Sequence, residues 1–498
     1  MEEKVSDSYS HVLKYTGIFG GVQGLNIVVG LVRNMLVARL LGPNGMGLVS
    51  LLNSTVNFVS QATNLGISFT AVKHVSELFD RGDEAAIANF VKVVRAWSLL
   101  TAVLGMLVCV LAGPALSNFT FAWGDHSLHF ILLSPAVALL AVTGGEMAIL
   151  KGARQLRPLA VIQVYTVLAA LVVSIPLYYF FGQRAIVPVI VLMALVSMLL
   201  TVRYSYRLYP LRLSGGCGLL GEGIGMVKLG MAFVVAGILG SGAEMLIRSY
   251  LNVSSGDLDV VGLYNAGFVL TITYAGMVFS AMETDYFPRL SSCSGVADTN
   301  LTVNRQIEVS LLIVSPMLAV LIISLPVLIP ILYSSKFLPI VEMAQVAVFS
   351  MYLKAVSLPI SYITLAKGDS VGYMVLEGIY DVLLVVLIVT GYRYWGLFGT
   401  GVALSVSYLL DILMVSAYVY LRYGYRPSAP VLYYALLQFS LGVAAYTVTF
   451  VDNAVIYWTL GVLICMVSLL VSVYILHQKT SLWASLMAKL KKVVRRHG

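Results

Sequence analysis

The segment that decides the fold is residues 31–57, which reads LVRNMLVARLLGPNGMGLVSLLNSTVN. Two long apolar runs meet here at Gly42-Pro43-Asn44-Gly45, a combination of residues typical of a tight turn. Each run approaches the roughly 20 apolar residues that an α-helix needs to cross a bilayer. The pattern therefore predicts two membrane-spanning helices joined by a short turn.

The same alternation of apolar run and short polar connection continues along the chain. Of its 498 residues, 59% are hydrophobic and 11% are charged, and the mean hydropathy is +0.91. A soluble protein of this length could not cover its surface with so few charges. We expect an all-α polytopic membrane protein without a cleavable signal peptide. The 14 predicted spans are 14–40, 46–72, 95–117, 128–150, 159–181, 186–204, 226–250, 260–282, 307–333, 340–365, 371–391, 396–420, 431–450 and 454–476.

The basic residues predict the orientation. If the N-terminus is cytoplasmic, most of the 31 Lys and Arg residues fall in cytoplasmic segments and few in outer ones. This asymmetry supports an even number of spans with both termini in the cytoplasm. We expect the location to be a bacterial inner membrane. It also explains the net charge of +8 without nucleic acid as a partner. Residues 477–498 have apolar positions at helical spacing among Lys and Arg, which predicts a basic amphipathic tail on the anionic inner leaflet.

Three short segments recur in the same order at an offset of about 210 to 216 residues. Met35-Leu36-Val37-Ala38-Arg39 is followed by Met245-Leu246-Ile247-Arg248, and Gly47-Leu48-Val49 by Gly262-Leu263-Tyr264. Leu150-Lys151-Gly152 is followed by Ala366-Lys367-Gly368. An offset of six spans keeps the orientation, so the halves are predicted to be parallel repeats. The expected organisation is an N-lobe (1–214), a C-lobe (215–425), two extra helices (426–476) and the tail (477–498).

Polar residues gather at helical spacing in the first two spans. Charges and amides at membrane depth are costly, so they mark either contacts between helices or a hydrated cavity. Arg33 in the first span is the first candidate for a substrate anion, because a guanidinium group binds phosphate well. The candidates for lining a cavity are Gln23 and Asn26 in the first span and Asn53, Asn57, Gln61 and Asn64, with Ser68, in the second.

The second half carries charged residues inside its spans. Lys354 is its candidate anion ligand, while Glu244 and Arg248 are one turn apart and able to pair. Glu377 and Asp381 carry like charge at the same spacing, so one of them is expected to hold a proton. With Glu244 and Asp411 they are candidates for coupling to a proton or sodium ion. Glu146 has Lys151 and Arg154 as its nearest basic residues, and we expect it to pair with one of them.

Several of these segments resemble a known family. Residues 16–47, including Val32-Arg33-Asn34-Met35-Leu36-Val37-Ala38-Arg39-Leu40-Leu41-Gly42-Pro43, are similar to the opening helix of Wzx-type polysaccharide flippases. These belong to the multidrug/oligosaccharidyl-lipid/polysaccharide exporter (MOP) superfamily. Ile149-Leu150-Lys151-Gly152, Val261-Gly262-Leu263-Tyr264-Asn265-Ala266 and Leu365-Ala366-Lys367-Gly368 also resemble recurring segments of that family.

The resemblance implies two six-helix lobes around a central cavity and transport by alternating access. It implies a polyprenyl-diphosphate-linked oligosaccharide as substrate and a polymerase and other polysaccharide-assembly proteins as partners. Related lipid II flippases have two arginines six residues apart near the end of the first helix, and Arg33 and Arg39 match this spacing. The resemblance thus assigns the diphosphate to Arg33 and Arg39, whereas Arg248 and Lys354 are candidates by position alone.

The predicted function is therefore a flippase for a lipid-linked repeat unit of O-antigen, capsule or exopolysaccharide. The alternatives are a lipid II flippase, a drug exporter of the same superfamily, and a membrane polymerase or ligase. The last would need a large outer loop, and the outer segments are short. The sequence contains no phosphate-cradling glycine loop, no metal-ligand spacing and no catalytic constellation, so we expect neither cofactor nor enzymatic activity. We also expect the four cysteines to be free thiols.

Overall fold

The computed structural model describes residues 2–121, 124–210, 221 and 223–479, and within these ranges the side chains at 2–23, 26–27, 156, 227–229, 231–233 and 280–285 are not described. The predicted tail at 477–498 therefore lies almost wholly outside the described residues. Every regular element in the described part is helical, and the chain is a multi-pass membrane protein. In order, the elements are α1 (Glu2–Thr63), α2 (Ile67–Arg81), α3 (Glu84–Leu111), α4 (Gly113–Thr120), α5 (Ser127–Gly152), α6 (Leu156–Phe181), η1 (Gly182–Ala185), α7 (Ile186–Leu208), α9 (Ile224–Ser255), α10 (Leu258–Phe268), η2 (Val269–Tyr274), α11 (Ala275–Ser291), α12 (Val296–Leu332), η3 (Ser335–Ile340), α13 (Val341–Ala347), α14 (Phe349–Ala366), α15 (Ser370–Tyr423), α16 (Ala429–Val448) and α17 (Ala454–Lys479).

Eleven helical segments of the described part are long and apolar enough to cross a membrane. Three of them contain a turn: α1 changes direction at Gly42, α15 changes direction at Gly396, and η1 separates α6 from α7. At Gly42 and Gly396 the φ angles are 68° and 58°, which glycine adopts without the steric cost that a Cβ atom brings. The turn expected at 42–45 is thus present, while the total of 14 spans stays a prediction.

Two predicted boundaries are wrong. The span expected at 46–72 is interrupted, because α1 ends at Thr63 and α2 begins at Ile67. The long connection expected around 283–306 is mostly helical, since α11 reaches Ser291 and α12 begins at Val296. Polar residues extend these helices beyond the apolar runs, and hydropathy alone does not detect such extensions.

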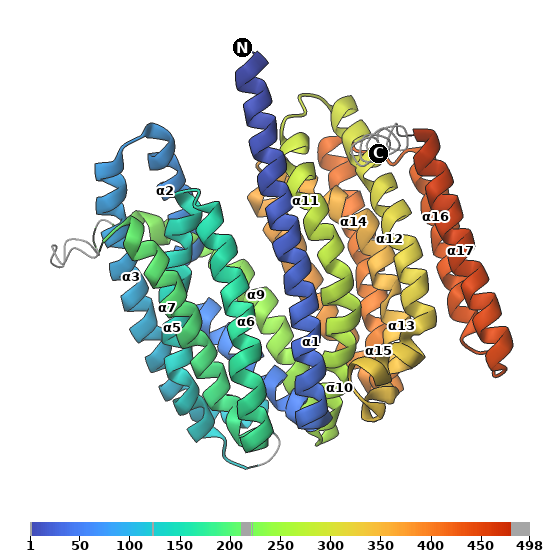
Figure 1. Ribbon diagram of the computed structural model, residues 1–498, viewed down its shortest axis with the longest axis horizontal. Coiled ribbons are helices and arrows are strands. Elements are labelled where there is room, and N and C mark those ends of the chain that lie inside the picture. Colours follow the sequence, from blue (N-terminus) through green and yellow to red (C-terminus); the bar gives the residue numbers. More distant parts are fainter. Residues whose placement is uncertain (1, 122–123, 211–220, 222, 480–498) are drawn as a thin grey trace, which may run out of the picture. The chain divides into compact units, whose positions relative to one another are not determined.

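By their internal contacts, the residues form two compact units. Unit 1 comprises 1–265 and 332–337, and unit 2 comprises 266–331 and 338–498. In unit 1, α5 packs against α2, α3 and α7, and α1 packs against α6 and α9 (Figure 1). A core of buried apolar residues joins α2, α3 and α5; it includes Ile67, Ala71, Val75, Ile87, Val91, Val94, Ala148 and Ile149. These units follow contacts and not sequence repeats, so the lobes predicted at 1–214 and 215–425 stay a prediction.

Two of the repeated segments lie against each other inside unit 1. A Cβ atom at Gly262 would overlap the carbonyl of Pro43, and one at Gly47 would overlap the carbonyl of Leu258. One turn further on, Ser50 Oγ donates a hydrogen bond of 2.8 Å to Asn265 Oδ1, a residue 215 positions away. Glycines at both matched positions therefore allow α1 and α10 to cross backbone to backbone.

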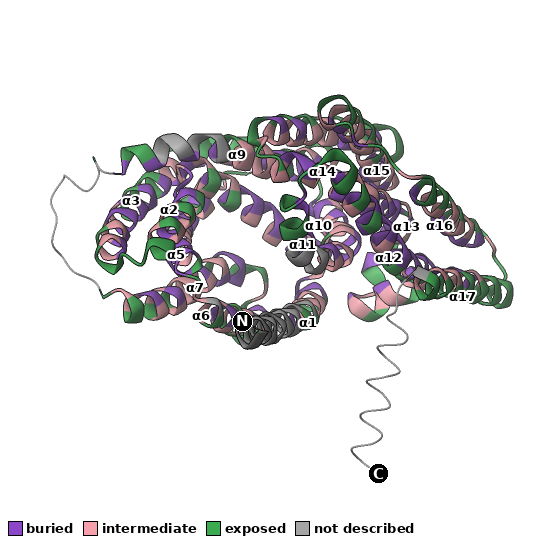
Figure 2. Cartoon of the chain, turned by 90° about the horizontal axis from the view of Figure 1, so that it is seen from above, coloured by how far each residue is buried: buried purple, intermediate pink, exposed green. Residues whose placement is uncertain are grey.

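In unit 2, α12 is buried along much of its length, with apolar residues at helical spacing such as Ile307, Leu311, Leu318 and Ile322. Hydrogen bonds reach its backbone from α13, α14 and α17: Gln345 to Ile322 O, Tyr352 to Ser315 O and Tyr457 to Ile323 O. Helix α14 packs against α11, α15 and α16, and α16 packs against α17. Viewed from above, buried residues lie between the helices of each unit and exposed residues lie on the outer sides (Figure 2).

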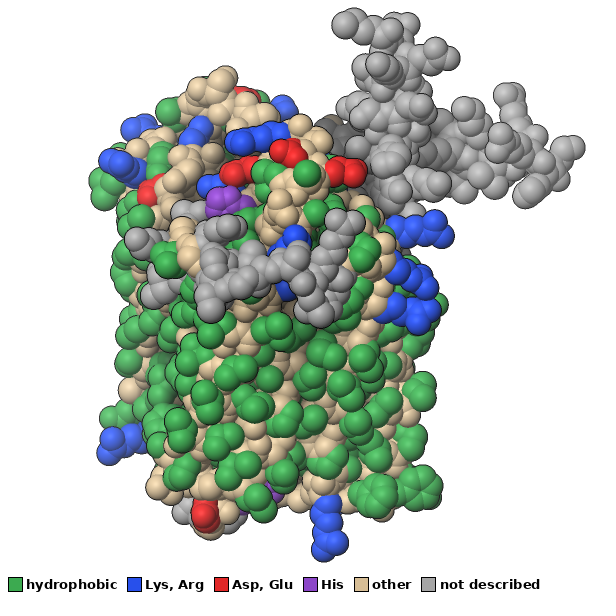
Figure 3. Space-filling model, turned by 90° about the vertical axis from the view of Figure 1, so that its left-hand side faces the viewer, with side chains coloured by type: hydrophobic (Ala, Val, Ile, Leu, Met, Phe, Trp, Pro, Cys, Tyr) green, Lys and Arg blue, Asp and Glu red, His purple; other side chains and the backbone are tan. Residues whose placement is uncertain are grey.

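The outward face of unit 1 has the character of a membrane-embedded surface. Figure 3 shows a broad band of hydrophobic side chains with charged side chains gathered toward its two ends. Exposed apolar residues on this unit include Leu99, Val103, Leu107 and Leu111, which follow helical spacing along α3. A continuous apolar band of this kind is stable only against lipid.

Candidate functional site

The polar residues of the second predicted span divide between two helices. Asn53, Asn57 and Gln61 lie on α1, the chain leaves the helix at Asn64, and Ser68 lies on α2. Leu65 and Gly66 adopt positive φ angles of 54° and 70° here, and Gly66 packs directly on Gly230 of α9. The continuous helical stripe expected from the sequence is therefore broken between Gln61 and Ser68.

This break forms one wall of a cavity in unit 1. The cavity has a volume of about 500 Å³ and lies between α1, α2, α5 and α9. Its polar lining comes from Asn57, Ser60, Gln61, Asn64, Ser68 and Thr143, with Gly66, Phe69, Leu140, Gly144, Val234 and Gly237 completing it. Three of the four predicted amide side chains of this segment thus line one cavity.

The amide side chains of this segment differ in whether they already make hydrogen bonds within the protein. Asn53 donates a hydrogen bond of 2.9 Å to Val49 O within its own helix, and it does not line the cavity. Asn64 Nδ2 donates to Ser68 Oγ at 3.0 Å, which ties the two sides of the helix break together. Asn57 and Gln61 are exposed in the cavity, and their amides make no hydrogen bond within the described part of the chain. Gln23 and Asn26, the other predicted lining residues, lie outside the described side chains.

Arg33 and Arg39 occupy different depths of the first half of α1. Arg39 is close to the turn at Gly42, whereas Arg33 lies about 14 Å from that turn along the helix axis, which is near the middle of a hydrocarbon layer of about 30 Å. Arg39 Nε donates to Tyr333 O at 3.3 Å. The Nε atom of Arg33 is buried and has no hydrogen-bond partner among the described residues, and its charge acts on the nearby Tyr178. Arg33 thus carries an unsatisfied donor at membrane depth.

Arg248 is held by residues of its own unit. Its Nε donates to Ser50 Oγ at 2.8 Å, and its Nη1 lies 3.1 Å from the Glu244 carboxylate. The pairing of Glu244 with Arg248 that the spacing allowed is therefore confirmed. The arginine side chain is 9% exposed and the glutamate 51% exposed. The roles of Arg248 in diphosphate binding and of Glu244 in ion coupling stay predictions.

In unit 2 the predicted charged residues converge from two helices. Lys354 of α14 interacts electrostatically with Glu377 and Asp411, which lie on the two halves of α15. The charge of Glu377 also acts on Asp411, which accepts a hydrogen bond from Ser357, while Glu377 accepts one from Tyr373. All three charged side chains are half-buried. Because α15 turns back at Gly396, carboxylates 34 positions apart in sequence are brought to one lysine.

Aromatic rings complete this cluster. The ammonium group of Lys354 lies 5.9 Å from the ring centre of Phe279 and 6.0 Å from that of Tyr408. Tyr380 hydrogen-bonds to Tyr408 and is within electrostatic range of Asp411. Asp381, the predicted neighbour of Glu377 one turn along α15, is half-buried, and its interaction with Glu377 stays a prediction. The structure therefore brings Glu377 and Asp411 to the same lysine, an association that helical spacing could not predict.

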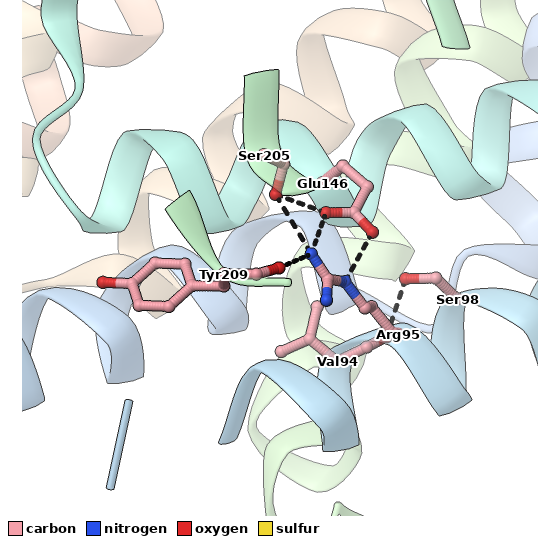
Figure 4. A network of polar contacts seen from close by, with 6 residues as sticks. All are labelled: Val94, Arg95, Ser98, Glu146, Ser205 and Tyr209. Atoms are coloured by element: carbon pink, nitrogen blue, oxygen red, sulfur yellow. Dashed lines mark hydrogen bonds and ion pairs between the residues drawn. The ribbon is translucent and has the colours of Figure 1, made fainter. Parts of the chain in front are cut away.

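A further charged pair was not predicted. Glu146 pairs with Arg95 of α3, with an Nε–Oε1 distance of 2.8 Å (Figure 4). It does not pair with Lys151 or Arg154, and Arg154 binds Asp80 instead. Arg95 Nη2 also donates to Tyr209 O at 2.9 Å, and Ser205 Oγ donates to Glu146 Oε2 at 2.5 Å. A glutamate inside an apolar run indicates that a cation is present, but not which one. The network joins α3, α5 and α7. Because Arg95 Nε already donates to Glu146, it is not available to a substrate.

Cys109, Cys293 and Cys465 are free thiols, as expected, and Cys217 lies outside the described residues. Among the residues that the structure describes, no three His, Cys, Asp or Glu side chains gather in a way that would hold a metal ion.

Sequence comparison identifies the family. A family model described as "Polysaccharide biosynthesis protein" matches residues 36–342, which include the cavity-lining part of α1 and the α1–α10 crossing. The chain belongs to this family. A search of curated protein sequences gives no significant match.

Solved structures with the fold of this polysaccharide biosynthesis family member are transporters of the MOP superfamily. The lipid II flippase MurJ in an inward closed conformation gives a TM-score of 0.71 at 14% identity, covering 93% of this chain and 99% of that chain. An inward-facing multidrug resistance MATE family transporter gives 0.67 at 15% identity, covering 80% and 94%. A MOP superfamily transporter from Pyrococcus furiosus gives 0.60 at 13% identity, covering 82% and 96%. At such identities the similarity establishes the fold alone.

Proposed function

We propose that this polysaccharide biosynthesis family member is a flippase that moves a polyprenyl-diphosphate-linked oligosaccharide across the bacterial inner membrane. The observation that carries the proposal is Arg33, a cation at mid-membrane depth whose buried Nε has no partner among the described residues. An unpaired guanidinium donor in a low-dielectric site is costly unless an anion arrives to satisfy it. A substrate diphosphate supplies such an anion.

The rest of the proposed site follows the chemistry of the substrate. Arg39, nearer the end of α1, makes a second diphosphate contact, and Arg248 and Lys354 are further candidates. The amides of Asn57, Gln61 and Asn64 line a cavity in unit 1 whose hydrogen-bonding character suits sugar hydroxyls. The lipid tail remains in the bilayer, so the protein needs no catalytic group and only alternating access.

The coupling proposal concerns the Lys354–Glu377–Asp411 cluster. Two carboxylates and one ammonium group give this cluster one surplus negative charge when all three are ionised. A proton or a sodium ion neutralises that surplus, and its arrival and departure would drive the transport cycle. Asp381 and Glu244 are additional candidates by position. Both termini are proposed to be cytoplasmic, and a polymerase on the outer side is the proposed recipient of the product.

The test is a reconstituted transport assay. Purified protein is placed in liposomes that contain a polyprenyl-diphosphate oligosaccharide with a fluorophore on the sugar, and an impermeant quencher reports which leaflet holds it. We expect transport by the wild type, loss of transport in Arg33→Ala and Arg39→Ala, and partial transport in Arg33→Lys, since a guanidinium–phosphate contact contributes about 1.5–3 kcal/mol. Arg184→Ala, which removes an exposed charge from η1, is the matched control.

The substrate classes are separated in the same assay. Wild-type rates in both Arg33→Ala and Arg39→Ala would refute the diphosphate assignment. Transport of labelled lipid II but not of other lipid-linked oligosaccharides would assign the protein to peptidoglycan synthesis. Uptake of a cationic dye alone would favour a drug exporter.

A further inference from the structure

A second pocket lies in unit 2, and none of its lining residues belongs to the Lys354–Glu377–Asp411 cluster. It has a volume of about 740 Å³ and is formed by the end of α11, the first turns of α12, the start of α16 and the end of α17. Its lining residues are Arg289, Leu301, Asn304, Arg305, Gln306, Glu308, Val309, Leu312, Ser428, Pro430 and Leu476. None of these residues has a role in the proposed transport site.

The charge of the pocket is positive. Arg289 and Arg305 are exposed within it, and Glu308 is its one carboxylate among the described lining residues. Arg289 is oriented by Gln306, whose Oε1 accepts a hydrogen bond of 3.3 Å from its Nη2. Arg305 has neither a hydrogen bond nor an ion pair within the described part of the chain. Its guanidinium group is therefore available to an anion.

The polar wall of the pocket is rigidly built. Asn304 of α12 donates to Arg426 O at 3.1 Å and accepts from Tyr425 Oη at 3.0 Å and from Ser428 N at 3.1 Å. These bonds fix the N-terminal end of α16 beside the two arginines. The buried hydroxyl of Ser428, which lines the pocket, has no hydrogen-bond partner in the described structure. The positive end of the 20-residue helix α16 adds to the attraction for an anion.

The remaining wall is apolar. Leu301, Val309, Leu312 and Leu476 line the same pocket, and α12 continues from it into one of the most apolar spans of the chain. A free phosphate ion would contact only the polar wall. A phospholipid would contact both walls, the polar one with its phosphate and the apolar one with an acyl chain. The basic residues here also belong to the segment that the charge distribution assigns to the cytoplasmic side, where bilayers expose acidic lipids.

We propose that this pocket binds an acidic phospholipid of the inner leaflet, with its phosphate between Arg289 and Arg305 and an acyl chain along the leucines. Such a lipid would link α11, α12, α16 and α17 at one end of unit 2. This inference is independent of the transported substrate, because no residue of the pocket belongs to the proposed transport site.

The experiment measures lipid binding by purified, delipidated full-length protein. Mixed micelles with phosphatidylglycerol or with phosphatidylcholine of identical acyl chains are added, and bound lipid is counted by native mass spectrometry alongside the thermal unfolding midpoint. We expect phosphatidylglycerol to bind and to raise the midpoint, and phosphatidylcholine to do neither. Arg305→Ala should weaken this binding about tenfold, as loss of one charge-assisted contact does. Arg305→Glu should abolish it, and Arg393→Ala, an exposed arginine elsewhere in unit 2, should leave it unchanged.

The outcomes are decisive in both directions. Unchanged phosphatidylglycerol binding in Arg305→Ala and Arg305→Glu, or equal binding of both lipids by the wild type, would overturn the proposal. If inorganic phosphate raises the unfolding midpoint as much as phosphatidylglycerol does, the lipid assignment is overturned and the pocket is a site for free phosphate. Because Arg305 is exposed and unpartnered, both variants should fold, and the unliganded unfolding midpoint verifies this.

Discussion

Gly47 of α1 and Gly262 of α10 lie backbone to backbone, with the amide nitrogen of Gly47 only 2.9 Å from the position that a Cβ atom on Gly262 would take. The two glycines belong to segments that the sequence matches to each other. A side chain on either one would overlap a main-chain carbonyl, of Leu258 or of Pro43, which cannot move aside as a flexible side chain can.

We therefore predict that Gly262→Ala, and likewise Gly47→Ala, lowers stability by about 1–3 kcal/mol or more, as overpacking of a close helix crossing does. The midpoint of thermal unfolding in detergent measures the effect. Gly225→Ala in α9 is the matched control, because a Cβ atom there meets nothing within 4 Å. Equal midpoints for Gly262→Ala and Gly225→Ala would contradict the close approach.

The buried Arg95–Glu146 pair predicts a large effect from a single truncation. Glu146→Ala leaves a guanidinium group buried without its partner, which costs about 3–5 kcal/mol. Replacing both residues, as in Arg95→Met/Glu146→Leu, should recover much of the loss, since no unpaired charge remains. Asp80→Ala provides the comparison, because it breaks the exposed pair with Arg154 and should cost no more than about 1 kcal/mol. Similar unfolding midpoints for Glu146→Ala and Asp80→Ala would show that burial does not determine how much each ion pair contributes to the free energy of unfolding.

The Lys354–Glu377–Asp411 cluster predicts that loss of one carboxylate uncouples transport from the ion gradient. Asp411→Asn should remove the dependence of the transport rate on the proton or sodium gradient, because it removes the surplus negative charge beside Lys354. The measurement compares the transport rate in liposomes with and without an imposed gradient. An unchanged gradient dependence in both Asp411→Asn and Glu377→Gln would refute the coupling role.

Asp369 predicts a pH-dependent contribution to stability. Hydrogen bonds from Tyr418 Oη at 2.6 Å, Tyr423 Oη at 2.7 Å and Gly372 N at 2.9 Å hold the pKa of this carboxyl group below its usual value. A lowered pKa means that the stabilisation is complete above the unfolded-state value of about 4 and is lost as the pH falls through the folded-state value. Asp369→Asn should therefore unfold at a lower temperature than the wild type at neutral pH, and the gap should narrow in acid. A gap that stays constant from neutral to acid pH would exclude this origin.

Much of the architecture could be predicted from residue order because membrane insertion is a local property. A run of apolar residues crosses the bilayer wherever it occurs, and Gly42-Pro43-Asn44-Gly45 turns the chain whatever surrounds it. The pairing of Glu244 with Arg248 was predictable for the same reason, since both lie on one helix face. The break between α1 and α2 was not predictable from hydropathy, because apolar residues such as Leu65, Ile67 and Phe69 continue through it.

The sequence by itself determined that this chain is a multi-pass helical membrane protein, which charges lie within its spans, and which segments recur. Only the tertiary structure decided which of those charges meet. Glu146 selects Arg95, 51 positions away, and Glu377 and Asp411 both meet Lys354 because α15 turns back at Gly396. The physical reason is that a buried charge requires a partner of opposite sign, but helix packing alone determines which partner is within reach.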